Sequence, residues 1–282
     1  MSKRFLLVVV LSVLLLTAPA SAKSSFSHVA AFGDSVSDNG FADGAGFMPY
    51  TNGLVWVEYL ANSLPGGPVS VKSYAWGGAM TNQANWDKIE WSGLLWQIEQ
   101  YKKEVGESDI SDVLHTIYCG GNDFWGKKKD GAFSAQNIVT AMEELTKMGA
   151  RHILVANQYT AVISPGYMKG DYASYRAPLT QFKKSVNTNL KKLVLTNEDS
   201  FSQRHAEVNV YYINSDDLFD KIAKDEKGYV FTNKTEKWLG TKEFPTPGKY
   251  LWWDEWHLMT RAHQLFGDFA LKTIKTSSQI VQ

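Results

Sequence analysis

Short apolar runs alternate along the chain with longer segments in which apolar residues recur every three or four positions. The short runs predict strands at residues 28–32, 69–74, 113–119, 152–157 and 208–213. The periodic segments predict helices near residues 54–64, 94–101, 138–145, 179–193 and 262–270. Alternation of this kind is typical of a three-layer α/β/α fold, in which helices cover both faces of a mostly parallel five-stranded sheet.

Two segments, residues 159–178 and 224–250, fit neither pattern and are rich in Gly, Pro, Lys and aromatic residues. We expect them to form excursions above the sheet. Ligands of open α/β sheets bind outside the carboxyl ends of the strands, so both segments are candidates for the walls of a cleft. No repeat or linker divides the chain, which predicts a single domain over residues 23–282.

The N-terminal segment has the pattern of a secretory signal peptide. Lys3 and Arg4 precede an apolar run at residues 5–16, and the small residues Ala20-Ser21-Ala22 follow it. The run is shorter than the roughly 20 residues of a membrane-spanning helix. We therefore predict a cleavable signal at residues 1–22 and a secreted or periplasmic protein.

Composition and charge exclude several classes of function. The 282 residues contain 29 basic and 29 acidic side chains, so there is no positive excess to bind a nucleic acid. Cys119 is the only cysteine, which rules out a disulfide within the chain. The 6 histidines lack the spacing of metal ligands, so we expect no metal and no cofactor.

Glycine-containing motifs follow the first two predicted strands. Gly33-Asp34-Ser35 comes directly after the first, where the serine is either a nucleophile or an ordinary helix cap. Trp76-Gly77-Gly78 comes after the second, where a glycine amide is free to approach a substrate oxygen or simply forms a turn. Each motif alone leaves both interpretations open.

Polar residues suited to acyl chemistry follow the third strand and precede the last helix. Asn122, in Gly120-Gly121-Asn122-Asp123, carries uncharged amide donors that can stabilise an oxyanion. Asp254 and His257 are three residues apart, close enough for the carboxylate to orient the imidazole as a base. Taken singly, the first is equally well a turn and the second a polar helix start.

The four motifs together resemble the GDSL esterases and lipases, also called SGNH hydrolases. The resemblance implies a flavodoxin-like fold and a serine esterase mechanism. It assigns Ser35 as nucleophile, Asp254 and His257 as the other members of a catalytic triad, and the Ser35 amide, Gly78 and Asn122 as oxyanion-hole donors. Gly77 adjoins Gly78, and the sequence leaves open which of the two donates.

The substrate class is open at this stage. The stretch Asn52-Gly53-Leu54-Val55-Trp56-Val57 resembles the block after the nucleophile in secreted bacterial phospholipases and acyltransferases of this family. The chain shows no evident carbohydrate-binding module, which favours a lipid or short-chain acyl ester as the small-molecule substrate. We expect transient contact with a membrane or lipid surface and no obligate protein partner. The alternatives are an acetyl esterase of acetylated carbohydrate and a non-catalytic binding protein. Four tryptophans are candidate substrate contacts, namely Trp76, Trp125, Trp253 and Trp256.

Overall fold

A computed structural model describes residues 26–40, 49–126, 130–241 and 247–279. The predicted signal peptide at residues 1–22 lies outside the described residues. None of the helices within these ranges combines the length and the apolar character that crossing a membrane requires.

The centre of the molecule is a five-stranded parallel sheet with the strand order β2-β1-β3-β4-β5. The three inner strands are almost entirely buried, as expected when helices cover both faces of a sheet. The predicted fold class and all five predicted strands are confirmed. The strands are β1 (His28–Gly33), β2 (Ser70–Ser73), β3 (Leu114–Tyr118), β4 (His152–Ala156) and β5 (Asn209–Ile213).

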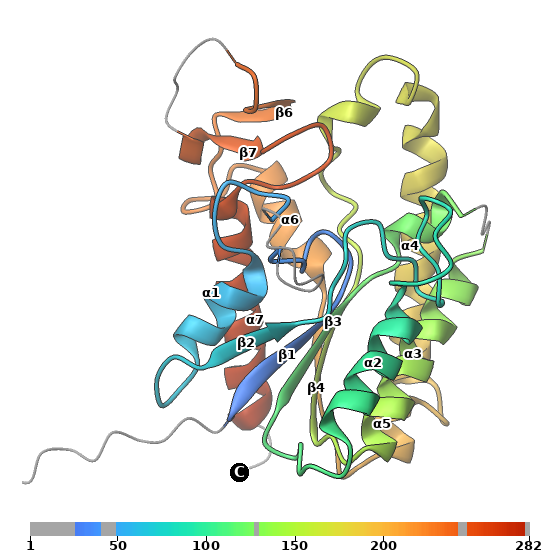
Figure 1. Ribbon diagram of the computed structural model, residues 1–282. Helices are drawn as coiled ribbons and strands as arrows, with labels where there is room; N and C mark the ends of the chain where they lie inside the picture. Colours follow the sequence, from blue (N-terminus) through green and yellow to red (C-terminus); the bar gives the residue numbers. More distant parts are fainter. Residues whose placement is uncertain (1–25, 41–48, 127–129, 242–246, 280–282) are drawn as a thin grey trace, which may run out of the picture.

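Helices form a layer on each side of this sheet (Figure 1). The first layer contains α1 (Trp56–Ser63), α6 (Ser215–Ala223) and α7 (Thr260–Gln279). The second contains α2 (Leu94–Val105), α3 (Gly131–Lys147), α4 (Arg176–Lys191) and α5 (Phe201–Arg204), and a π-helical turn at Lys192–Thr196 continues α4. Helices α5 and α6 were not predicted. Helix α5 has only four residues, and the apolar positions of the nine-residue α6 directly follow β5, so they did not stand out as a separate helix.

Each layer encloses its own apolar core. On one side the ring of Trp56 in α1 stacks on Phe266 of α7, with 4.8 Å between ring centroids. On the other side Phe32 of β1 packs edge-on against Tyr101 of α2. Side chains of β1 alternate between the two cores, so this strand fixes both layers relative to one another.

The two segments predicted as excursions contain short regular elements. Residues 159–178 hold two 3-10 turns, Pro165–Tyr167 and Ala173–Tyr175, and the first residues of α4. Residues 224–250 hold β6 (Asn233–Lys237), which pairs with β7 (Tyr250–Trp252) next to a 3-10 turn at Pro247–Lys249. Figure 1 shows this small sheet at one end of the molecule, outside the central sheet. The polar sequence of β6 carries no apolar alternation, which explains why it was not predicted.

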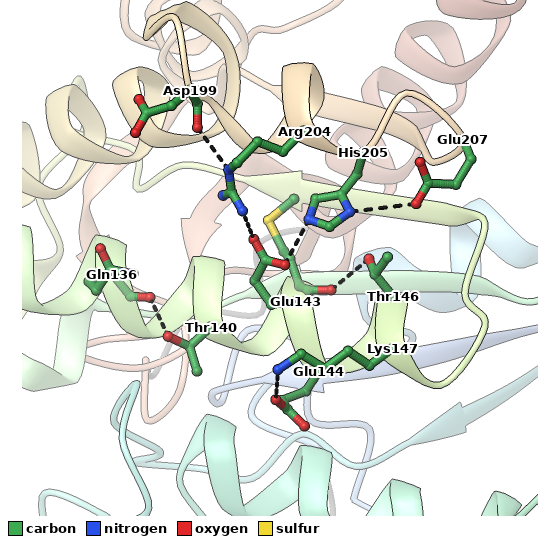
Figure 2. A network of polar contacts seen from close by, with 11 residues as sticks. Gln136, Thr140, Glu143, Glu144, Thr146, Lys147, Asp199, Arg204, His205 and Glu207 are labelled. Carbon is green, nitrogen blue, oxygen red and sulfur yellow. Dashed lines mark hydrogen bonds and ion pairs between the residues drawn. The ribbon is translucent and has the colours of Figure 1, made fainter.

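A polar network on the outer surface joins α3 to the chain around α5 (Figure 2). Glu143 accepts hydrogen bonds from Arg204 Nη1 at 2.6 Å and lies 2.7 Å from His205 Nε2. Arg204 also donates to the carbonyl oxygen of Asp199. These contacts hold a short helix that buries only the side chain of Phe201.

Candidate active site

Ser35, His257 and Asp254 form one hydrogen-bonded chain. Ser35 Oγ lies 3.0 Å from His257 Nε2. His257 Nδ1 lies 2.8 Å from Asp254 Oδ2 and 3.0 Å from Oδ1. The structure thus brings a residue at the exit of β1 together with two residues from the loop before α7, more than 200 positions later in the chain.

The exit of β1 is shaped by close backbone packing. Gly33 has φ of +144°, and a Cβ at this position would lie 2.0 Å from the carbonyl oxygen of Tyr118. The buried side chain of Gln97 accepts a hydrogen bond from Gly33 N–H and donates one to Gly33 O, both at 2.8 Å. Only glycine fits here, and the chain emerges from the sheet with Ser35 at a fixed position.

The loop before α7 holds the carboxylate and the imidazole in register. Asp254 Oδ1 accepts the backbone N–H groups of Trp256 and His257, each at 2.7 Å. Burial alone would raise the pKa of the Asp254 carboxyl, but the hydrogen bonds and charge of His257 and these backbone donors hold it below its ordinary value. The carboxylate is therefore ionised and its second oxygen faces the imidazole.

Ser35, Gly78 and Asn122 line the same cavity, and each has an N–H group without a partner among the described residues. Asp38 Oδ2 accepts the N–H of Gly77 at 2.8 Å, whereas the N–H groups of Gly78 and Ser35 donate to no group in the described part of the chain. Asn122 Nδ2 gives one of its two N–H bonds to the carbonyl oxygen of Ala79. Of the two glycines that the sequence left open, Gly77 has its N–H engaged by Asp38, and Gly78 has an N–H without a partner among the described residues.

Asp123 fixes the glycine loop, a role that the sequence analysis missed. Its carboxylate accepts the backbone N–H of Thr81 and the Thr81 hydroxyl, the latter at 2.8 Å. Burial raises the pKa of Asp123 to about 6 despite these hydrogen bonds. Asp123 thus connects the exit of β3 to the loop that carries Gly78. Its position directly after Asn122, a proposed oxyanion donor, was the one feature of the sequence that could have indicated this role.

Asp34, beside the serine, is buried and accepts the N–H of Val36 at 3.1 Å. Burial raises the pKa of its carboxyl to about 7, although the Val36 hydrogen bond and the charges of Lys183 and His257 act in the opposite direction. Its contacts are those of a residue that shapes the serine turn.

A cavity of about 580 Å³ opens over Ser35 and His257, a size typical of small-molecule sites. Three of the predicted tryptophans line it: Trp76, Trp125 and Trp256. The prediction for Trp253 is wrong, because its ring stacks on Trp238 and is not part of the wall. The lining also includes six aromatic residues that were not predicted: Tyr50, Trp86, Tyr118, Tyr159, Tyr167 and Tyr172.

The two segments predicted as cleft walls differ in outcome. Residues 159–178 supply much of one wall, including Tyr159 and Tyr167. Described residues of 224–250 do not line the cavity, because this segment forms the small sheet beyond it. Sequence composition identified both as irregular but could not distinguish a wall from a neighbouring sheet.

Other reactive side chains lie in structural settings. Cys119 is buried, its Sγ lies 3.6 Å from the carbonyl oxygen of Ala79, and burial raises the pKa of the thiol well above its ordinary value. His263 is buried and its Nδ1 accepts the N–H of Trp56 at 3.3 Å. In the described ranges no three His, Cys, Asp or Glu residues gather in a way that would hold a metal ion.

Comparisons with known proteins identify the family and the fold. The family model described as GDSL-like lipase/acylhydrolase matches residues 29–269. A phosphatidylcholine-sterol acyltransferase of Aeromonas hydrophila is 29% identical over 158 residues, which are 49% of this chain and 46% of that protein. The chain therefore matches about half the length of this relative.

Among solved structures, a lipolytic protein of the G-D-S-L family from Veillonella parvula has the same fold. The match has a TM-score of 0.51 at 20% identity and covers 88% of this chain and 98% of that one. The family model covers most of the chain, and the five-stranded parallel sheet is consistent with it: this protein belongs to the GDSL-like lipase/acylhydrolase family.

Proposed function

We propose that the protein hydrolyses carboxylic esters through a Ser35–His257–Asp254 catalytic triad and an acyl-enzyme intermediate. The observation that carries the proposal is the continuous contact from Ser35 Oγ through both imidazole nitrogens to the Asp254 carboxylate. This is the arrangement in which a histidine acts as the base for a serine nucleophile.

In the first half of the reaction, His257 Nε2 takes the proton of Ser35 as Oγ bonds to the ester carbonyl carbon. When the tetrahedral intermediate collapses, the bond to the alcohol oxygen breaks and His257 returns the proton to the leaving alcohol. A water molecule then gives its proton to His257 and attacks the acyl-enzyme. Collapse of the second intermediate releases the carboxylic acid and restores Ser35.

The negative oxygen of both intermediates lies, in this proposal, between the N–H groups of Ser35 and Gly78 and the side-chain amide of Asn122. The free state of these N–H groups supports the assignment, because donors aimed in advance at the developing charge need no reorganisation during the reaction.

For the substrate we propose an acyl ester of a lipid. The cavity wall is rich in aromatic side chains, and three of them, Tyr50, Trp86 and Tyr172, are between 41% and 50% exposed. Such a surface suits an apolar chain and transient contact with a lipid surface. A relative named for phosphatidylcholine and sterol supports the same class.

The test is hydrolysis of p-nitrophenyl esters from acetate to palmitate by the wild type and by a folded Ser35→Ala variant. We expect the variant to lose hydrolysis on every ester and the wild type to prefer acyl chains longer than acetate. Activity that survives in Ser35→Ala would refute the serine mechanism. A maximum at acetate would refute the lipid assignment and favour acetyl esters.

The place of action is a separate proposal, secretion or export to the periplasm, and it rests on the sequence of residues 1–22. N-terminal sequencing of the protein recovered outside the cytoplasm tests it. We expect the mature chain to start at Lys23, and an intact Met1 would contradict the proposal.

A further inference from the structure

One wall of the cavity is a basic face of helix α4. Arg176, Thr180 and Lys183 are separated by four and three residues, so they lie on one side of the helix, and all three line the cavity with Ser35 and His257. Neither cation was singled out by the sequence analysis, and the proposed mechanism uses neither.

Lys183 lies deep in the site. A Cβ on Gly121 would lie 3.8 Å from Lys183 Cε, which places the lysine stem beside the residue that precedes Asn122. Its Nζ lies 4.6 Å from the centroid of the Tyr159 ring. The ammonium is therefore close to the proposed oxyanion donors and contacts an aromatic face.

No carboxylate of the described residues lies within ion-pair distance of Lys183 Nζ. Burial lowers the pKa of Lys183 to about 8, while the more distant charges of Asp34 and Asp216 favour its protonated form. A partly buried ammonium without a directly bonded partner is unusual, because desolvation of a charge is costly.

Arg176 stands two helical turns away and is exposed. Its guanidinium forms no ion pair with a described residue. The Thr180 hydroxyl contacts only the backbone of Arg176, by donating to its carbonyl oxygen. The two cations thus mark a path along α4 that leads from the exposed end of the cavity toward Ser35.

We propose that Lys183 and Arg176 bind the phosphate of an ester substrate that carries one. Two cations on one wall, neither paired with a carboxylate among the described residues, fit a multiply charged anion, and both residue types are common ligands of phosphate. The two acidic residues of the cavity lining do not lie on this wall. Asp34 is buried in the serine turn, and Asp87 belongs to the loop between β2 and α2, so neither carboxylate would repel an anion bound against α4. The inference rests on the proposed function and specifies its substrate.

The experiment compares two esters that differ only in the phosphate, 1-hexanoylglycerol and 1-hexanoylglycerol 3-phosphate. We measure the ratio of kcat/KM for the phosphate ester to that for the neutral ester. The loss of one charged hydrogen bond predicts that the ratio falls about tenfold or more in Lys183→Met and in Arg176→Gln, through KM. Lys183→Arg, which keeps the charge, recovers most of the ratio.

Lys184→Met is the matched control, because Lys184 is the next residue of α4, is exposed and does not line the cavity. An unchanged ratio in both Lys183→Met and Arg176→Gln overturns the inference, as does an equal loss on the two esters. If Lys183→Met does not fold, the exposed Arg176→Gln variant still decides.

Two further arms separate the alternatives. Inorganic phosphate, used as a competitor, distinguishes a site for the free ion from a site for the phosphate group of the substrate. If phosphate inhibits the wild type but the ratio of kcat/KM for the two esters is unchanged in the variants, the ligand is free phosphate and the inference is overturned. Calorimetric binding of both esters to Ser35→Ala tests the subsite without turnover. Hydrolysis that persists in Ser35→Ala refutes the proposed mechanism, whereas weaker binding of the phosphate ester after Lys183→Met still supports the subsite.

Discussion

At the scale of single residues, one hydrogen bond distinguishes the two adjacent glycines of the proposed oxyanion hole. The N–H of Gly77 donates to Asp38 Oδ2, whereas the N–H of Gly78 has no acceptor in the described part of the chain. Gly77 O is also occupied, by the amide of Asn85. The first glycine therefore anchors the loop, and in the proposed mechanism the second donates to the oxyanion.

Asn122 provides a direct test of this donor set. We expect Asn122→Ala to lower kcat by about 10²- to 10³-fold, the usual effect of removing one oxyanion-hole donor. KM should change much less, because the donor acts mainly on the transition state. The measurement is steady-state hydrolysis of a p-nitrophenyl ester by variants of matched circular dichroism.

Asn189→Ala is the control for the Asn122 variant. Asn189 also bonds through its amide to a backbone carbonyl, that of Ser185, but it lies on α4 outside the cavity lining. Its kcat should equal that of the wild type. A less than tenfold fall in Asn122→Ala would remove Asn122 from the proposed mechanism.

At the scale of elements, the exit of β1 depends on helix α2. Gln97 exchanges two hydrogen bonds with Gly33 and donates a third to the carbonyl oxygen of Ser92, so one side chain fixes the strand end and the start of its own helix. Because Ser35 follows two residues later, the position of the proposed nucleophile depends on the packing of α2 against β1.

Gln97→Met keeps the side-chain volume and removes all three hydrogen bonds. Gly33 N–H and Ser92 O then lose their hydrogen-bond partner, whereas Gly33 O keeps the N–H of Trp76 at 3.1 Å. At 1–3 kcal/mol for each of the two buried groups, we expect the free energy of unfolding to fall by about 2 kcal/mol or more. Urea denaturation measures it. Gln100→Met, on the same helix with only a 3.5 Å contact to Trp96 O, should cost far less. Equal stability of the two variants would contradict this role of Gln97.

The network between α3 and α5 should contribute little by comparison. Arg204 is 45% exposed, and exposed ion pairs are typically worth less than about 1 kcal/mol. Glu143→Ala should therefore lower the free energy of unfolding by about 1 kcal/mol or less, and the difference should shrink at high salt. A salt-independent loss above about 2 kcal/mol would show that the network carries more of the stability than its exposure implies.

The sequence predicted those elements whose burial leaves a periodic pattern. The five strands and the long helices were predicted because their apolar residues face a core and therefore recur at regular positions in the sequence. The polar strand β6 left no such signal. The motif residues were found because parallel strands end at one edge, but Lys183 and Tyr167 come from segments where only the folded chain shows which side faces the cavity.

Trp253 shows the same limit from the other direction. It directly precedes Asp254 in the sequence, yet its ring stacks on Trp238, a contact that the sequence pattern could not predict. Its backbone remains near the site, since Trp253 N–H donates to the carbonyl oxygen of His257 at 2.8 Å. Proximity in sequence thus predicted proximity of the chain and not the direction of the side chain.

At the scale of the whole molecule, buried ionisable groups oppose one another in their dependence on pH. Burial raises the pKa of Asp34 to about 7 and that of Asp123 to about 6, and it lowers the pKa of His115 to about 4 and that of His263 to about 3. Between about pH 4 and pH 6, unfolding releases protons from the two aspartates and takes up protons on the two histidines. The contributions have opposite sign, so we expect the free energy of unfolding to change little across this range.

Replacing one of these histidines should reveal the opposite pH dependence of stability that the aspartates contribute. Unfolded His263 has an ordinary pKa of 6.5, so in the wild type its stabilising contribution is present above that pH and is lost as the pH falls toward about 3. His263→Gln lacks this loss and keeps a hydrogen-bond acceptor for the N–H of Trp56. Relative to the wild type, its free energy of unfolding should increase by about 1.4 kcal/mol for each pH unit below 6.

Urea denaturation of both proteins from pH 4 to pH 8 measures this difference. Above pH 7 the two curves should be separated by a constant amount, the cost of the altered packing, because the histidine is then neutral in both states. Below pH 6 they should converge or cross, since only the wild type takes up a proton at this residue on unfolding. Curves that remain parallel down to pH 4 would show that His263 is protonated in the folded protein, and the buried imidazole would then need a carboxylate partner.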